Sequence, residues 1–287
     1  MFKAEMEVLA FVHSGLDVNN TIIKLYNHIY MKGWFHMVEL NGKVVIITGA
    51  AMGMGAATAE LMAEAGGKVV IADFNEEMGR QQTQKIIDAG GTAAFVKVDV
   101  SNEAQVEAMV QFAVDTFGRL DGAVNNAARI PDDKVLVDLE ESTWDNLLAV
   151  DLKGVALCLK YEIRQMLKQG GGGSIVNTSS VSGIRPQPAN PAYVAAKHGV
   201  IGLTKQAAFD YSPQGIRINS VAPGAIDTPM LQEALVKFGL DPVTYPKQLS
   251  MLGRFAQASE VAQGNLWLIS DLSSYVTGTV LCIDGGY

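Results

Sequence analysis

Short apolar runs alternate with segments of helical periodicity from residue 44 to the end of the chain. The runs hold four to six residues and are rich in Val and Ile: VVIIT (44–48), KVVIA (68–72), AAFVKV (93–98), GAVN (122–125), SIVNT (174–178), RINSV (217–221) and TVLCI (279–283). Almost wholly apolar strands separated by helices indicate a parallel sheet that is buried on both faces. Right-handed crossovers then predict one doubly wound α/β domain over residues 39–287, with its ligand crevice at the strands' carboxyl ends.

Two segments depart from this alternation. In residues 1–38, Asn20 precedes an apolar stripe at helical spacing, which predicts a helical extension that packs on the body or on another subunit. The alternative is a floppy tail upstream of a protein that starts at Met37. Residues 227–256 hold every Pro and Met that follows residue 226, and we expect an irregular lid over the crevice.

Composition narrows the class of partner. The net charge of −8 and the pI near 5.0 argue against nucleic acid or an anionic membrane as the main partner. The two cysteines, Cys158 and Cys282, lie in apolar runs, which indicates buried thiols in a reducing compartment. No apolar run approaches the roughly 20 residues of a membrane span, so we expect a soluble cytoplasmic protein. The four histidines lack ligand partners at metal-binding spacing, and we expect no metal site.

A glycine-rich turn directly follows the first apolar run and opens the first helical segment. The stretch Thr48–Gly55 reads TGAAMGMG, with Gly49, Gly53 and Gly55 around Met52 and Met54. Glycines there permit a tight turn and let the backbone approach a pyrophosphate at the helix N-terminus. Because the required strand–turn–helix context is present, the stretch predicts a Rossmann-like dinucleotide site.

Acidic residues at the ends of the next two runs bear on the choice of cofactor. Asp73 can accept hydrogen bonds from ribose hydroxyls and would repel a 2′-phosphate. No Lys or Arg follows within Phe74–Glu76, which favours NAD(H) over NADP(H). The alternative is that Asp73 caps the following turn. Asp99 and Val100 end the third run and could meet the adenine edge, although Asp at a strand end is common in turns.

Tyr193 and Lys197 stand four residues apart at the head of a helical segment, thirteen residues after Ser180. Positions i and i+4 share a helix face, so the ammonium can lie beside the phenol and favour its ionised form. Ser180 is predicted at a strand end, where its hydroxyl could hold a substrate oxygen. Such a tyrosine can take a proton from an alcohol, or give one to a carbonyl, while a hydride leaves or arrives. The alternative is a packed Tyr193 and a solvated Lys197.

From about residue 40 onward the chain resembles the short-chain dehydrogenase/reductase family. The glycine turn matches that family's cofactor turn, and Asn125–Ala128 matches its fourth-strand Asn-Asn-Ala-Gly, with Ala128 where Gly is usual. The trio of Ser180, Tyr193 and Lys197 matches the catalytic residues. Two further segments match at family spacing: Pro223–Thr228, which receives the nicotinamide carboxamide through Ile226 and Thr228, and Tyr275–Gly286.

The resemblance implies a role for each matched residue. Tyr193 would be the general acid/base, and Ser180 would orient the substrate oxygen. Lys197 would bind the nicotinamide ribose and lower the Tyr193 pKa, and Asn126 would stabilise the sheet beside the cofactor. Asp151 stands where the family usually has an asparagine that helps to hold a proton-relay water. A carboxylate there offers no amide donor, and its charge would partly oppose the effect of Lys197.

Within the family, the chain looks most like the bacterial 20β-hydroxysteroid dehydrogenases, and the family resemblance implies a homotetramer. The predicted activity is NADH-dependent, reversible reduction of a ketone, with the 20-keto group of a steroid as the first candidate. The alternatives are a sugar, cyclic diol or small ketone as substrate, or a non-catalytic NAD(H)-binding regulator. The predicted lid carries many residues that suit an apolar substrate or a packing contact: Met230, Leu231, Leu235, Val236, Phe238, Leu240, Tyr245, Leu249, Met251 and Leu252.

Overall fold

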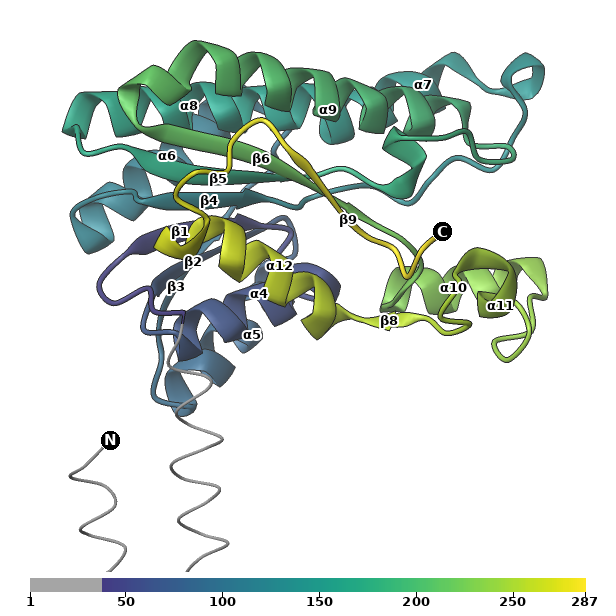
Figure 1. Cartoon of the computed structure of the whole chain (residues 1–287), viewed down its shortest axis with the longest axis horizontal. Coiled ribbons are helices and arrows are strands. Elements are labelled where there is room, and N and C mark those ends of the chain that lie inside the picture. The colour runs from purple at the N-terminus through teal and green to yellow at the C-terminus, as the bar shows by residue number, and fades with distance from the viewer. Residues whose placement is uncertain (1–37) are drawn as a thin grey trace, which may run out of the picture. The chain divides into compact units, whose positions relative to one another are not determined.

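A seven-stranded parallel sheet forms the centre of the described chain, which is residues 38–287 of a computed structural model (Figure 1). Its strand order is β3-β2-β1-β4-β5-β6-β9. The order reverses between β1 and β4, which is the switch point where doubly wound sheets bind ligands. The strands are β1 (Val44–Thr48), β2 (Lys68–Asp73), β3 (Thr92–Lys97), β4 (Gly122–Asn125), β5 (Gly173–Thr178), β6 (Ile216–Pro223) and β9 (Val280–Ile283).

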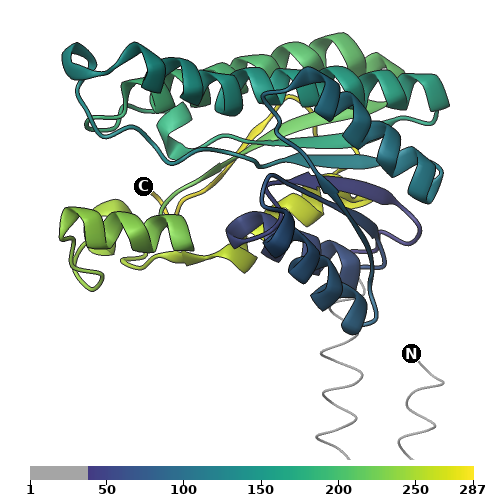
Figure 2. The same cartoon turned by 180° about the vertical axis from the view of Figure 1, so that it is seen from behind.

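Helices cover both faces of the sheet, as the two opposite views show (Figures 1 and 2). One face carries α4 (Gly53–Glu64), α5 (Glu76–Asp88) and α12 (Ala258–Ile269). The other carries α6 (Glu103–Phe117), α8 (Val155–Gln169) and α9 (Pro191–Tyr211), with α7 (Glu141–Leu148) leading into α8. Every residue of β1 and β4 is buried, which is why their sequences are nearly continuous apolar runs rather than alternating ones.

The predicted α/β architecture is confirmed, and each of the seven apolar runs is a strand of the sheet. Two expectations about the strands of this sheet were wrong. The third strand ends at Lys97, so Asp99 and Val100 lie beyond it in the following turn. Cys282 is exposed although Cys158 is buried, because Cys282 lies on β9, an edge strand that pairs on one side only. The predicted helical extension over residues 1–38 falls almost entirely outside the described residues.

The predicted lid contains regular structure rather than an irregular loop. Its elements are β7 (Ile226–Asp227), α10 (Pro229–Phe238), α11 (Pro246–Leu249) and β8 (Ala256–Gln257). Thr228 caps α10 by accepting a hydrogen bond from the main-chain N–H of Leu231, and Pro229 occupies the first helical position. Gly239 ends the helix in the left-handed conformation. These are ordinary helix start and stop signals, and they outweigh the Pro and Met content of the segment.

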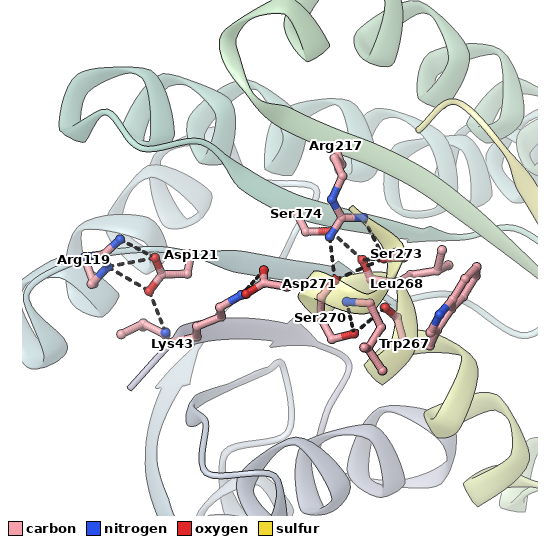
Figure 3. A network of polar contacts seen from close by, with 12 residues as sticks. Lys43, Arg119, Asp121, Ser174, Arg217, Trp267, Leu268, Ser270, Asp271 and Ser273 are labelled. Carbon is pink, nitrogen blue, oxygen red and sulfur yellow. Dashed lines mark hydrogen bonds and ion pairs between the residues drawn. The ribbon is translucent and has the colours of Figure 1, made fainter. Parts of the chain in front are cut away.

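A polar network links the amino ends of several strands (Figure 3). The glycine turn lies at the opposite, carboxyl ends of the strands. Arg217 of β6 donates to the Ser273 hydroxyl, and Lys43 forms an ion pair with Asp271. Asp121, just before β4, accepts a hydrogen bond from the main-chain N–H that begins β1. The network joins the segment after α12 to the sheet. The loops at the carboxyl ends of the strands can therefore form a site on a rigid scaffold. Within residues 38–287, no helix is long and apolar enough to cross a membrane.

Candidate active site at the carboxyl ends of the strands

The glycine turn connects β1 to α4 and has the geometry of a phosphate cradle. Gly49 and Gly53 have φ of 63° and 58°, a conformation that glycine adopts without steric cost. A Cβ on Gly55 would lie 2.2 Å from the Gly49 carbonyl oxygen, so only glycine fits. Within the described residues no side chain caps α4 at Met52, and the N–H groups of its first turn remain available to an anion. Met54 lies in that first turn.

Asn126 holds the shape of this turn from the neighbouring strand. Its side-chain amide donates to the carbonyl oxygens of Thr48 and Gly49, at 3.1 Å each. In return, the Thr48 hydroxyl accepts hydrogen bonds from the main-chain N–H groups of Asn126 and Ala127, at 3.0 and 3.1 Å. These contacts tie the ends of β1 and β4 together at the switch point. The fit favours a dinucleotide whose pyrophosphate rests on α4.

The Asp73 carboxylate accepts two main-chain hydrogen bonds. One carboxylate oxygen accepts a hydrogen bond from the Asn75 N–H at 2.8 Å, so Asp73 does cap its own turn. The other accepts from the Ala51 N–H at 2.9 Å, which attaches it to the glycine turn. Each oxygen retains a lone pair that can accept from a ribose hydroxyl. Phe74, directly after Asp73, is 71% exposed.

The other predicted cofactor residues differ in whether they lie beside the glycine turn. Asp99 accepts hydrogen bonds from the N–H and the hydroxyl of Ser101, so its carboxylate serves its own turn. Val100 is buried. Ile226 is buried beyond β6, and the Thr228 methyl group would be in van der Waals contact with a Cβ on Gly53. The segment after β6 therefore lies beside the glycine turn, which local sequence alone does not establish.

The structure brings Ser180, Tyr193 and Lys197 together. Tyr193 lies in the first turn of α9, and the Lys197 Nζ atom is 5.3 Å from the centroid of its ring. Ser180 lies two residues beyond β5, and its hydroxyl accepts from the Ser182 N–H at 3.1 Å. Burial raises the pKa of Tyr193, and the Lys197 charge and the Ser180 hydroxyl only partly offset it. The predicted lowering by Lys197 is thus present, but desolvation outweighs it.

Asp151 is the buried counterion of Lys197. Their charged groups lie 3.2 Å apart, and the Lys197 ammonium also donates to the Thr178 carbonyl oxygen at 3.2 Å. Burial lowers the pKa of Lys197, but the Asp151 charge and hydrogen bond together with the Tyr193 phenol outweigh burial, so the net pKa is raised. Burial raises the pKa of Asp151 against the lowering effect of Lys197. As predicted from its charge, Asp151 also raises the pKa of Tyr193.

Asp151 is positioned by an irregular turn between two helices. It lies in a π-helical segment, Ala149–Gly154, that joins α7 to α8. Such segments widen the helix locally and are frequent at functional sites. One Asp151 oxygen accepts from the main-chain N–H of Arg129 at 2.8 Å, which anchors the loop after β4 to the site.

Sequence reasoning missed two residues that touch the trio's backbone. The Ser179 hydroxyl donates to the Lys197 carbonyl oxygen at 2.9 Å. Asp132, in the loop after β4, accepts from the main-chain N–H of Tyr193 at 2.9 Å. Asp132 is sixty-one residues from Tyr193, so no local spacing pattern could have found it.

Comparison with known proteins decides the family. The family model described as enoyl-(acyl carrier protein) reductase matches residues 49–287. A short chain dehydrogenase/reductase, astE, of Aspergillus oryzae is 44% identical over 257 residues, which are 89% of this chain and 98% of that protein. The chain belongs to the short-chain dehydrogenase/reductase family. It is therefore an oxidoreductase acting on CH–OH groups, and the family generally binds NAD(P)(H).

Other members of the short-chain dehydrogenase/reductase family that resemble this chain are named for ring compounds. The 2,5-dichloro-2,5-cyclohexadiene-1,4-diol dehydrogenase of Sphingobium indicum is 42% identical, covering 88% of this chain and 99% of that protein. A 3beta-hydroxysteroid dehydrogenase of Mediterraneibacter gnavus is 35% identical, covering 89% and 98%. The crystal structure of levodione reductase superposes with a TM-score of 0.80 at 36% identity, covering 85% and 97%. The narrower resemblance to 20β-hydroxysteroid dehydrogenases stays a prediction.

A buried polar network lies behind the site of this family member, between the sheet and the helices α8 and α9. Glu162 of α8 accepts a hydrogen bond from the Asn125 side-chain amide at 3.0 Å. That amide also donates to the Asn177 side-chain oxygen, and the Asn177 amide donates to the Thr204 hydroxyl, each at 3.0 Å. Burial raises the pKa of Glu162 to about 7, and the hydrogen bond from Asn125 only partly offsets this.

Replacing Glu162 with Gln is expected to change how stability depends on pH. An unfolded Glu162 loses its proton near pH 4.5, whereas the folded protein keeps it until about pH 7. The native state therefore binds more protons in this window, and the free energy of unfolding falls by about 3 kcal/mol as pH rises through it. Urea unfolding at pH 5 and pH 8 should show that fall reduced in Glu162→Gln. Glu107→Gln, at an exposed position, is the matched control. The expectation would be contradicted if the free energy of unfolding fell by the same amount between pH 5 and pH 8 in the wild type and in Glu162→Gln.

Proposed function

We propose that the protein is an NAD(H)-dependent dehydrogenase that interconverts a cyclic secondary alcohol or diol with its ketone. One observation supports the proposal above all. The Ser180–Tyr193–Lys197 trio and the glycine turn both lie at the carboxyl ends of strands of the same parallel sheet. Two proteins similar to this chain, levodione reductase and the cyclohexadiene-diol dehydrogenase, are named for ring substrates. They support a cyclic substrate more than a sugar.

Each residue of the trio has a separate task in this proposal. A bound nicotinamide dinucleotide supplies the hydride in reduction and accepts it in oxidation. The Tyr193 hydroxyl gives its proton to the substrate oxygen in reduction and takes it back in oxidation. The Ser180 hydroxyl holds that oxygen beside the phenol. The Lys197 ammonium favours the ionised phenol. The same ammonium also donates a hydrogen bond to the ribose of the nicotinamide half.

Asp73 supports NAD(H) as the cofactor, because a 2′-phosphate beside its carboxylate would meet like charge. We expect the Kd for NADH to be at least about 100-fold lower than that for NADPH, and Asp73→Ala to reduce this ratio to within about 10-fold. Nucleotide fluorescence titration measures both constants. Asp88→Ala is the matched control, because this exposed carboxylate lies at the last position of α5 and is not among the predicted cofactor residues. An unchanged ratio in Asp73→Ala would show that another group sets the preference.

A substrate panel tests the proposal directly. NAD⁺ with cyclohexanol or a cyclic diol, and NADH with a cyclic diketone, should give turnover followed by absorbance. A 20-ketosteroid is the second candidate, favoured by the steroid-active relative and by exposed apolar residues on the lid segment: Met230, Val236, Phe238, Met251 and Leu252. A kcat/KM for the steroid that exceeds the values for all small rings would reverse the order of the two candidates. Tight NADH binding without turnover on any member would favour the NAD(H)-binding regulator.

A further inference from the structure

The catalytic helix begins without a cap of its own. Asn190 precedes α9, but its side chain makes no capping hydrogen bond to the helix and instead donates to the carbonyl oxygens of Asp132 and Ala189. Ala189 has φ of 54° and is the one non-glycine residue in the left-handed region among residues 38–287. Local sequence therefore does not hold the first turn of α9 in place. Another part of the chain must do so.

Asp132 supplies the missing cap. Its two carboxylate oxygens accept from the main-chain N–H groups of Ala192 and Tyr193, at 3.1 and 2.9 Å. Asp132 is only 6% exposed, so both hydrogen bonds are shielded from water. A carboxylate bound to the N–H groups of a helix start is stabilised by charge-assisted hydrogen bonds and by the helix dipole. The contact includes the N–H of the tyrosine itself.

The loop that carries Asp132 is held on both sides. At Arg129 its main-chain N–H is bonded to Asp151, the counterion of Lys197. At Asp133 it forms an ion pair with Lys237 of α10, in the predicted lid. A loop attached at these two points can resist movement of the helix start that it caps.

We propose that Asp132 is a positioning residue that fixes the Tyr193 phenol against the Lys197 ammonium, an inference that rests on the proposed role of Tyr193. Lys197 lies one turn further along α9 and is held by other partners, Asp151 and the Thr178 carbonyl oxygen. Loss of the cap would release the first turn, so that the phenol moves while the ammonium stays. Displacement of a reacting group by about 1 Å can cost a factor of about 100 in rate.

The test compares Asp132→Asn with Asp138→Asn, an exposed carboxylate on the same connection between β4 and α7. The full-length proteins carry 3-fluorotyrosine, and the Tyr193 fluorine resonance is assigned by its loss in Tyr193→Phe. With NADH bound, Asp132→Asn should shift or broaden this resonance, whereas Asp138→Asn should not. In alcohol oxidation, kcat per NADH-binding site should fall about 10- to 100-fold. The primary isotope effect from deuterium on the carbinol carbon should rise, and the Kd for NADH should change less than twofold.

A purely structural role would give a different pattern. It would reduce the folded fraction and leave kcat per NADH-binding site and the isotope effect unchanged. A folded Asp132→Asn protein with an unmoved Tyr193 resonance would overturn the proposal, as would a moved resonance with unchanged kcat. Asp132→Ala, measured in the same way, gives a second and larger perturbation. Because the fluorine and NADH measurements need no turnover, failure of the cyclic-alcohol proposal would be seen separately, in the wild-type panel.

Discussion

Tyr193→Phe is expected to lower kcat about a thousandfold, because general acid–base catalysis by one positioned group contributes factors of about 100 to 10,000. The phenyl ring keeps the packing of Tyr193 but has no proton to exchange with the substrate oxygen. Hydride transfer would then leave an alkoxide or a protonated ketone without a partner. The Kd for NADH should change only a few-fold, because the glycine turn and Asp73 are untouched. Stopped-flow or steady-state absorbance at saturating substrate measures kcat, and fluorescence titration measures the Kd.

Tyr211→Phe is the matched control for this change. Tyr211 is the last residue of the same helix, α9, far from Ser180 and Lys197. Its replacement should leave kcat within about twofold, as is usual for a change away from the reacting groups. Turnover by Tyr193→Phe at the wild-type rate would remove Tyr193 from the mechanism and leave a nucleotide-binding protein whose acid lies elsewhere.

Lys197→Met is expected to reduce both activity and stability. Removing the ammonium leaves the Asp151 carboxylate fully buried without its counterion, which costs about 3–5 kcal/mol of folding free energy or forces Asp151 to take up a proton. The phenol also loses the charge that lowers its pKa, so kcat should fall at least about 100-fold at neutral pH. Urea unfolding and steady-state kinetics measure the two effects. Lys205→Met, an exposed lysine on the same helix, should change neither.

A second variant separates the two losses. In Lys197→Met/Asp151→Leu, no charge remains buried, because a pair of apolar residues replaces the ion pair. Such replacements are often neutral or stabilising, so most of the lost free energy of unfolding should return. The activity should stay low, since the ammonium is still missing. If the double variant is as unstable as Lys197→Met, the loss of stability comes from packing around Lys197 and not from the stranded carboxylate.

Much of the fold and part of the site follow from local sequence. Strand runs such as Val44–Thr48 are apolar throughout because both faces of the sheet are covered, and this pattern is legible without the structure. Gly55 and its neighbours mark the tight turn before α4, because only glycine fits at Gly55. Tyr193 and Lys197 share a face because the helix period brings i and i+4 together. Each of these features depends on residues that are close in the chain.

The remaining features depend on which distant segments meet. Asp132 caps α9 from another loop, and Glu162 ends a network that spans two strands and two helices. Burial and the Asp151 charge raise the pKa of Tyr193, whereas Lys197 and Ser180 lower it, and burial has no local signature. Spacing along the sequence determined which groups could react, because neighbouring residues keep their geometry in any well-formed helix or turn. The packing of the chain decided how those groups are held and charged, because desolvation and long-range contacts exist only once it has folded.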